Sequence, residues 1–316
     1  MTNTSTNTST NTSTDTSTDA STNTGSAPTA FDSVAGDDAA SGTILVTAGT
    51  GTTGRRVAQR LRAAGHHVRI GSRAGSPPFD WHDEATWPAA VDGITVAYLA
   101  YSPDLALPGA ADTVGAFARF AAAHGVSRLV LLSGRGEPHA QRAERLVQDA
   151  GAEWTIVRCA AFTQNFTEGA FAGQVMDGAV ALHVDDVPEP FVDVEDIADV
   201  AFAALTDRRH AGQVYELTGP RLLTFSEALS TIGAAIGRPV AFVKVSAAEL
   251  QAGLEAIGLP ADEAAMLVDL FGEIFDGHNS HLDDGVERAL GRPARDFADV
   301  IADAAAAGAW GGGRTA

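Results

Sequence analysis

The sequence predicts an α/β protein with a doubly wound parallel Rossmann sheet and a smaller, partly helical C-terminal portion that covers the substrate. Three observations predict this fold. Five short β-rich segments alternate with helical patterns between residues 42 and 160. These segments are apolar almost throughout, as expected for strands covered by helices on both faces. A glycine-rich turn joins the first strand to the first helix. Strand–helix alternation of this kind implies a parallel sheet.

The elements follow in a regular order. The expected strands cover residues 43–48, 67–72, 94–100, 128–133 and 154–158. The helical patterns between them cover residues 52–65, 83–93, 111–125 and 139–151. Each pattern repeats apolar residues at spacings of three to four and closes on a glycine, which suits a helix C-terminus.

After residue 160 the regular alternation of strands and helices ends. Residues 191–207 indicate a strand that enters a helix, and acidic residues crowd the start of that helix, where we expect them to act as caps. Residues 213–219 and 240–246 indicate two further strands. Thr224 stands three residues before Glu227, a capping box that opens a helix, and Ser246 is expected to cap the next one. The remainder to Trp310 is expected to be mainly helical.

We divide the chain into a tail and one integrated domain. Residues 1–41 are rich in Thr, Ser and Asn and form a low-complexity tail. Because ordering costs about 1–2 kcal/mol per residue, a segment with so few apolar side chains is expected to be disordered. It has neither the basic start nor the apolar run of a signal peptide. Residues 42–160 form the dinucleotide-binding core, and residues 161–316 add sheet elements and the substrate portion.

Composition limits the partners. The formal net charge of −19 would repel a nucleic-acid backbone, so we expect no nucleic-acid partner. No window approaches 18 uncharged apolar residues, so we expect no membrane span. Cys159 is the single cysteine, which excludes an internal disulfide and suits a cytoplasmic location. A small-molecule substrate is the expected partner, and the oligomeric state is left open.

The turn after the first strand predicts a dinucleotide site. Gly49, Gly51 and Gly54 form G-x-G-x-x-G between a strand and a helix. In this setting the first glycine permits the tight turn, the second admits a pyrophosphate, and the third lets helix and strand pack closely. The N–H groups from Thr50 through Thr52 to Thr53 then favour an anion. The alternative is a glycine-rich turn without a ligand.

The end of the second strand favours NADP(H) over NAD(H). An NAD site usually has an acidic residue there, whereas this chain has Ser72 and Arg73. A guanidinium binds a 2′-phosphate in bidentate fashion, and Arg55 at the helix start would add a second positive contact. The alternative is that Arg73 is merely solvated.

Common ketone-reducing machinery is missing. Short-chain dehydrogenases that reduce ketones generally use a Tyr-x-x-x-Lys pair, in which the ammonium lowers the pKa of the phenol. The only lysine is Lys244, and none of the tyrosines Tyr98, Tyr101 and Tyr215 stands four residues before it. Ordinary carbonyl reduction by that pair is therefore excluded.

Ordered motifs between residues 43 and 310 resemble a specific family. They read ILVTAGTGTTGRRVAQRL, AYSPDLALPG, LVLLSGRGE, WTIVRCAAFTQNFTEG, PFVDVEDIADVAFAALTD and YELTGPRLLTFSEA. Together they resemble the NmrA-like branch of atypical short-chain dehydrogenases, and within it the group around festuclavine (agroclavine) dehydrogenase of ergot alkaloid biosynthesis. Ala48 stands where the branch more often has a glycine.

The resemblance implies a Rossmann core and reduction of an iminium by NADPH. An iminium carbon becomes a neutral amine on receiving hydride, so no protein acid is required, which agrees with the missing Tyr/Lys pair. Positioning then supplies much of the catalysis. Two other functions stay open: a non-catalytic NADP(H)-sensing regulator of the NmrA type, and a quinone or enone reductase.

Candidate site residues stand at the strand ends. Besides the turn, cofactor contacts are expected from Thr47, Ala100 and Ala161. Tyr101 and Ser133 are the candidate catalytic residues, with packing or turn roles as the alternative. The resemblance implies that the segment after residue 160 approaches nicotinamide and substrate. In that segment Phe162 and Phe166 would form an aromatic wall and Asn165 would orient a polar group, unless the rings are core and Asn165 caps a turn. The histidines offer no metal spacing, and we assign no metal.

Overall fold

The structure is a computed structural model that describes residues 42–311. All of these residues belong to one compact unit. The expected low-complexity tail, residues 1–41, lies outside the described residues.

The central sheet confirms the predicted fold class. It contains β1 (Thr43–Thr47), β2 (Val68–Gly71), β3 (Ile94–Leu99), β4 (Arg128–Gly134), β5 (Glu153–Cys159) and β7 (Gln213–Leu217). The strands pair in the order β2-β1-β3-β4-β5-β7, and every pair is parallel. Because the chain leaves β1 in one direction for β2 and returns to its other side as β3, the topology switches at β1. Ligands bind outside the carboxyl ends of the strands at such a point.

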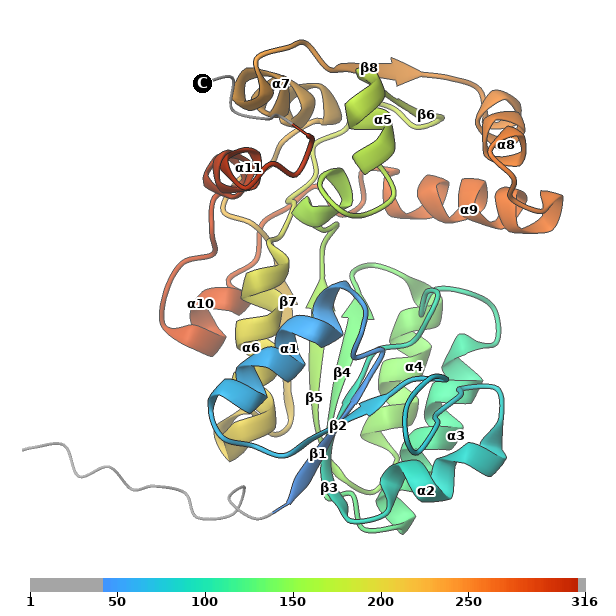
Figure 1. Ribbon diagram of the computed structural model, residues 1–316, viewed down its shortest axis with the longest axis vertical. Helices are drawn as coiled ribbons and strands as arrows, with labels where there is room; N and C mark the ends of the chain where they lie inside the picture. Colours follow the sequence, from blue (N-terminus) through green and yellow to red (C-terminus); the bar gives the residue numbers. More distant parts are fainter. Residues whose placement is uncertain (1–41, 312–316) are drawn as a thin grey trace, which may run out of the picture. The chain divides into compact units, whose positions relative to one another are not determined.

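Helices cover both faces of the sheet, as Figure 1 shows. On one face lie α1 (Thr52–Ala63) and α6 (Val194–Thr206), whose apolar residues pack with Val46, Tyr98 and Val157 of the strands. On the other lie α2 (Trp87–Val91), α3 (Ala110–Ala123) and α4 (Pro138–Gln148). The alternating side chains of each strand are thus buried on both sides, which explains why the strands read as continuous apolar runs.

The C-terminal elements build a second core beyond the sheet. They are α5 (Ala172–Asp177), β6 (Ala179–Leu182), α7 (Phe225–Ile236), β8 (Ala241–Lys244), α8 (Ala247–Ala256), α9 (Ala261–Ile274) and α11 (Phe297–Ala306). By contrast, α10 (Gly285–Leu290) packs on the core of the sheet beside β7 and α6. Short 3-10 turns cover Glu84–Thr86, Thr163–Phe166 and Arg208–His210. The capping boxes of Thr224 with Glu227 and of Ser246 with Glu249 are both present. The expected strand at residue 191 is reduced to one bridge between Phe162 and Val192, because the chain enters α6 at Val194.

The acidic residues at the start of α6 bind arginines instead of capping the helix. No side chain caps the N-terminus of α6. Glu195 binds Arg56 and Arg60 of α1 at 2.6 Å. Asp196, which is fully buried, binds Arg295 at 2.5 Å and Arg292 at 2.7 Å. The expectation of capping is therefore wrong, and these carboxylates join α1 and the C-terminal segment to α6.

Candidate active site

The glycine-rich turn has the close approaches that the motif predicts. A Cβ on Gly54 would lie 2.3 Å from the carbonyl oxygen of Ala48, and one on Gly49 would lie 2.7 Å from the side chain of Ile70. The turn therefore packs directly on the first helix and on β2. Only glycine permits both contacts.

The first helix presents uncapped N–H groups at this turn. Gly51 is the N-cap residue of α1, and no side chain caps it. The first turn of α1 contains no acidic residue. Thr50 and Gly51 are exposed, Thr52 is half-buried, and Thr53 is buried. The free N–H groups and the helix dipole together suit a diphosphate.

Ala48 has a strained backbone at the same turn. Its φ is +47°, and it is the only non-glycine residue with positive φ in the part of the chain that the structure describes. The left-handed conformation favours glycine, which gives a physical reason for a glycine at this position in the branch.

Thr47 and Ala100 join the two strands at the switch point. Both residues are buried. The Thr47 hydroxyl accepts the N–H of Ala100 at 2.8 Å and donates toward the carbonyl oxygens of Tyr98 and Ala100, at 3.1 and 3.2 Å. The structure thus gives the Thr47 side chain a strand-linking position, without a surface for the cofactor contact expected from the sequence.

Ser72 and Arg73 follow β2 at the same edge of the sheet. Thr47 of β1 is in register with Gly71 of β2, so the two chain exits lie side by side. Arg73 is exposed. Within residues 42–311, which the structure describes, its guanidinium has no ion pair. Its guanidinium is therefore available to an anionic ligand.

Arg55 is engaged elsewhere. Its guanidinium pairs with Glu168 at 2.5 Å, and Glu168 also binds Arg56 at 2.8 Å. Glu168 belongs to the segment after β5, so these ion pairs connect the start of α1 with that segment. Arg55 is not free to meet a 2′-phosphate in this arrangement.

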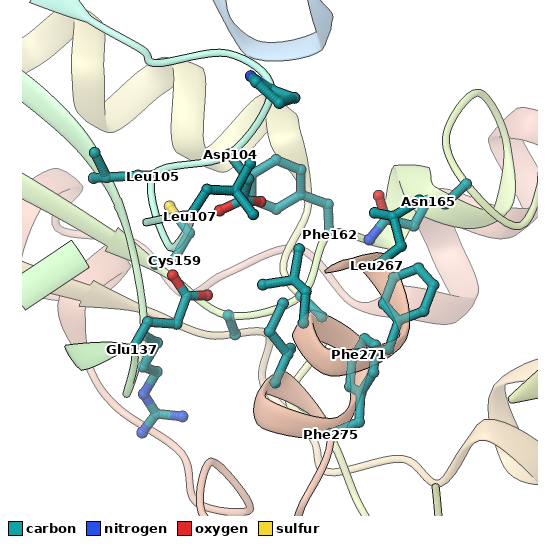
Figure 2. A pocket seen from close by; sticks show the side chains of 18 of the residues that line it. Asp104, Leu105, Leu107, Glu137, Cys159, Phe162, Asn165, Leu267, Phe271 and Phe275 are labelled. Atoms are coloured by element: carbon teal, nitrogen blue, oxygen red, sulfur yellow. The ribbon is translucent and has the colours of Figure 1, made fainter. Parts of the chain in front are cut away.

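A cavity of about 530 Å³ opens at the carboxyl edge of the sheet. Its floor comes from the segments that follow β3, β4 and β5, and its roof from α8 and α9. Figure 2 shows the roof residues Leu267 and Phe271 of α9, and Phe275 directly after this helix, facing Cys159 and Glu137 across the space. The cavity and the glycine-rich turn lie at the same edge, because parallel strands end together.

Tyr101 lines this cavity but lacks the environment of a strong acid. Its phenol lies 3.2 Å from Nε2 of His82, and its ring packs against Trp81. Burial and the charge of Asp80 raise the pKa of the Tyr101 phenol. No lysine opposes this effect, because Lys244 lies on β8 and pairs with Asp185.

Ser133 also lines the cavity, and its hydroxyl proton has a fixed partner. The hydroxyl donates to Oε1 of Glu144 at 2.6 Å. Glu144 is held in turn by Nε and Nη2 of Arg158, at 2.9 and 2.5 Å, and Arg158 binds Glu216 at 2.5 Å. Ser133 can therefore accept a hydrogen bond from a ligand, while its own proton stays with Glu144.

The segment after β5 contributes three of the four residues proposed from the sequence. Ala161, Phe162 and Asn165 line the cavity. Phe166 does not: it is fully buried and packs against rings that include Phe171, Phe191 and Phe225. In place of Phe166, Phe271 of α9 and Phe275 at the end of this helix contribute aromatic rings to the cavity lining.

Sequence reasoning missed two carboxyl groups in the cavity, Asp104 and Glu137. Burial raises the pKa of Asp104. Burial, with nearby Asp104, Glu273 and Glu144, raises the pKa of Glu137 to about 8. The available signal was their position, since each follows a strand end. Among the described residues no group of three or more His, Cys, Asp and Glu is placed to hold a metal ion. No helix between residues 42 and 311 is long and apolar enough to cross a membrane.

Comparisons with known proteins identify dehydrogenases and reductases as relatives of this chain. No protein-family model matches the chain. The chain is 33% identical over 282 residues to agroclavine dehydrogenase of Claviceps fusiformis, covering 83% of this chain and 96% of that one. It is 32% identical over 285 residues to (4-alkanoyl-5-oxo-2,5-dihydrofuran-3-yl)methyl phosphate reductase of Streptomyces griseus, covering 84% and 98%.

Solved structures share the fold. Triphenylmethane reductase of Citrobacter, solved with NADP(H), superposes with a TM-score of 0.68 at 19% identity, covering 83% of this chain and 99% of that one. NmrA, a negative transcriptional regulator, superposes with a TM-score of 0.62 at 14% identity, covering 83% and 95%.

The fold and the relatives together define an oxidoreductase of the Rossmann class, with a glycine-rich dinucleotide turn and an open apolar cavity at the same edge of the sheet. Within that class the chain belongs to the family of NAD(P)H-dependent oxidoreductases that includes agroclavine and festuclavine dehydrogenases, and it shares its fold with NmrA.

Proposed function

We propose that the protein transfers hydride from NADPH to a C=N bond or a polarised C=C bond of a small organic molecule. The observation that carries this proposal is the apolar cavity at the carboxyl edge, lined by Tyr101 but without a lysine. An acceptor that is already electrophilic does not need the Tyr/Lys pair that ketone reduction uses. The name of the Streptomyces relative describes a reductase of an oxo-dihydrofuran, which is consistent with a polarised acceptor.

The residues at the turn fit NADP(H). The uncapped N–H groups of α1 would bind the diphosphate, and the tight packing at Gly49 and Gly54 shapes the backbone for it. Arg73 would bind the 2′-phosphate, since its guanidinium has no partner among the described contacts and no acidic residue takes its place. When bound, this cofactor supplies the hydride.

The chain's own contribution is to hold the acceptor and exclude water. Leu267 and Phe271 of α9, with Phe275 directly after it, cover the cavity. Phe162 and Asn165 face the cavity from the segment after β5. A ring-shaped organic molecule would pack between these side chains, with Asn165 orienting a polar group. Holding donor and acceptor at near-attack distance supplies a large part of the rate.

Two measurements test the proposal. Oxidation of NADPH is followed by the loss of its near-ultraviolet absorbance with a panel of cyclic imines, N-alkyl iminium salts, enones and quinones. Steady turnover with one class supports the proposal. Tight NADPH binding with no turnover across the panel rejects it and favours a cofactor-sensing regulator. In Arg73→Ala, NADPH should bind about tenfold to a hundredfold more weakly while NADH binding is unchanged. If Arg73→Ala prefers NADPH over NADH as strongly as wild type does, Arg73 does not bind the 2′-phosphate.

A further inference from the structure

One carboxyl group in the cavity has an oxygen without a partner. Glu137 stands between β4 and α4, and only 6% of the residue is exposed. Its Oε2 is buried and accepts no hydrogen bond. The same carboxyl group packs on Gly134, where an added Cβ would lie 2.0 Å from Oε2. Figure 2 shows the group facing the interior of the cavity, on the side of Cys159 and Asp104. A polar atom so placed is expected to have a ligand as its partner.

The groups around Glu137 do not offer it a counter-ion. Titratable groups that act on it come from four elements: Asp104 after β3, Glu144 of α4, Cys159 at the end of β5 and Glu273 of α9. The carboxyl groups among them disfavour its ionised form. The nearby cations bind other groups. Arg135 binds Glu216 and the carbonyl oxygens of Asn279 and His281; its Nη2 is buried without a hydrogen-bond partner, but Arg135 is not among the groups that shift the pKa of Glu137. Arg158 binds Glu144 and Glu216, and His278, which lies against Gly136, binds Asp276.

Glu137 is therefore a neutral carboxylic acid at neutral pH. Its pKa is about 8, mainly because burial disfavours the charge and secondarily because Asp104 and other carboxylates lie nearby. A carboxylic acid that is neutral at pH 7 can donate a proton, whereas an ordinary carboxylate cannot.

We propose that Glu137 is the proton donor of this enzyme, and that its substrates include neutral C=N or conjugated C=C compounds, which need a proton as well as a hydride. This inference rests on the proposed function. It replaces the missing Tyr/Lys pair with a carboxylic acid that reaches the cavity from the segment after β4.

The step balances with the groups named. For a neutral imine, the hydride forms a new C–H bond at carbon, and the C=N π electron pair takes the proton of Glu137 at nitrogen. The product amine leaves, and Glu137 remains as a carboxylate. The hydride and its two electrons would come from bound NADPH, which would thereby be oxidised to NADP⁺. Water then returns a proton to Glu137. A permanently charged N-alkyl iminium needs only the hydride, so its reduction does not depend on Glu137.

This difference gives a direct test. Wild type and Glu137→Gln are compared on a cyclic imine and on the N-methyl iminium salt of the same ring, from pH 6 to pH 10. Glu137→Gln should reduce the imine about 10²–10⁴-fold more slowly than wild type, the usual range for loss of a general acid. Its rate with the iminium salt should stay within about threefold. An equal loss with both substrates, or no loss with either, overturns the proposal.

A second variant and a direct titration separate catalysis from folding. In wild type, kcat/KM for the imine should fall above pH about 8 relative to that for the salt. Asp104→Asn should move this fall to lower pH, because one like charge is removed. In the cofactor-free protein, the infrared difference between wild type and Glu137→Gln should contain a carboxylic C=O band that disappears near pH 8. Glu189, whose pKa is also raised to about 8, is present in both proteins and cancels in this difference. If this band has already disappeared below pH 6, the proposal is overturned, and this result does not depend on any measurement of activity. Wild-type turnover of neither substrate instead rejects the proposed function itself.

Discussion

The replacement of Gly51 by aspartate tests the dinucleotide site without unfolding the protein. Gly51 is the N-cap of α1 with φ −78° and ψ −179°, an extended conformation that any residue adopts. An added Cβ would meet only the carbonyl oxygen of Ala48, at 3.2 Å. Aspartate is among the best N-cap residues and exceeds glycine there by a few tenths of a kcal/mol. The free energy of unfolding should therefore change by less than about 0.5 kcal/mol.

The same change should strongly weaken cofactor binding. The new carboxylate would accept hydrogen bonds from the N–H groups that the diphosphate needs. It would also place a negative charge beside the phosphates. Two unit charges about 5 Å apart repel by about 3 kcal/mol at an effective dielectric constant of 20. We expect Gly51→Asp to weaken NADPH binding by at least about a hundredfold.

Calorimetric titration with NADPH and thermal unfolding of the free protein measure the two effects separately. Gly253→Asp is the matched control, because Gly253 is exposed on α8 and an added Cβ there has no neighbour within 4 Å. It carries the same charge change and should bind NADPH as wild type does. A dissociation constant for Gly51→Asp within threefold of wild type, in a folded protein, refutes the account of the turn.

Three further predictions follow from strained or buried residues. Ala48→Gly should relieve the strain of the left-handed φ of +47° and raise Tm by about 2–4 °C. Ala63→Gly, at the end of α1, should instead lower Tm. Scanning calorimetry that finds Tm changes of the same sign for both variants contradicts this. Glu144→Gln should lower the free energy of unfolding by about 3 kcal/mol, because buried Glu144 neutralises Arg158; urea unfolding with a loss below 1 kcal/mol speaks against it. Glu189 is 1% exposed, and burial raises its pKa to about 8 despite Arg135 nearby, so it stabilises the fold in its neutral form, fully below pH 4.5 and progressively less toward pH 8. In urea unfolding, the free energy of unfolding of Glu189→Gln should rise relative to that of wild type by up to about 1.4 kcal/mol per pH unit between these values. A difference in free energy that does not change with pH would count against the argument.

Features that depend on neighbours in the sequence were predictable. The capping boxes at Thr224 and Ser246 follow from residues three positions apart, and the structure contains both. The close approach at Gly54 follows from the strand–turn–helix context of its motif. The sheet itself follows from the alternation of apolar strands and amphipathic helices, because few topologies accommodate that pattern.

Features that depend on residues far apart in the sequence could not be predicted. β6 is only four residues long and pairs with β8, which lies about sixty positions later in the chain, so no local pattern marks it. Phe166 and Phe271 look alike in sequence, yet one is core and the other lines the cavity. Glu137 stands in a polar loop, and only packing against α9 and the segment after β3 removes it from water. Thr47 was expected to touch the cofactor, but a buried hydrogen bond to the backbone of β3 occupies its hydroxyl.

The cavity takes its floor from the sheet and its roof from α8 and α9. These helices are a separate stretch of chain from the turn at Gly51 and from Glu137. Substitutions along the roof would alter which substrates the cavity accepts, while the cofactor site at the glycine-rich turn stays unchanged. A library confined to the roof-facing positions of α9 is thus the economical route to new acceptors on this scaffold.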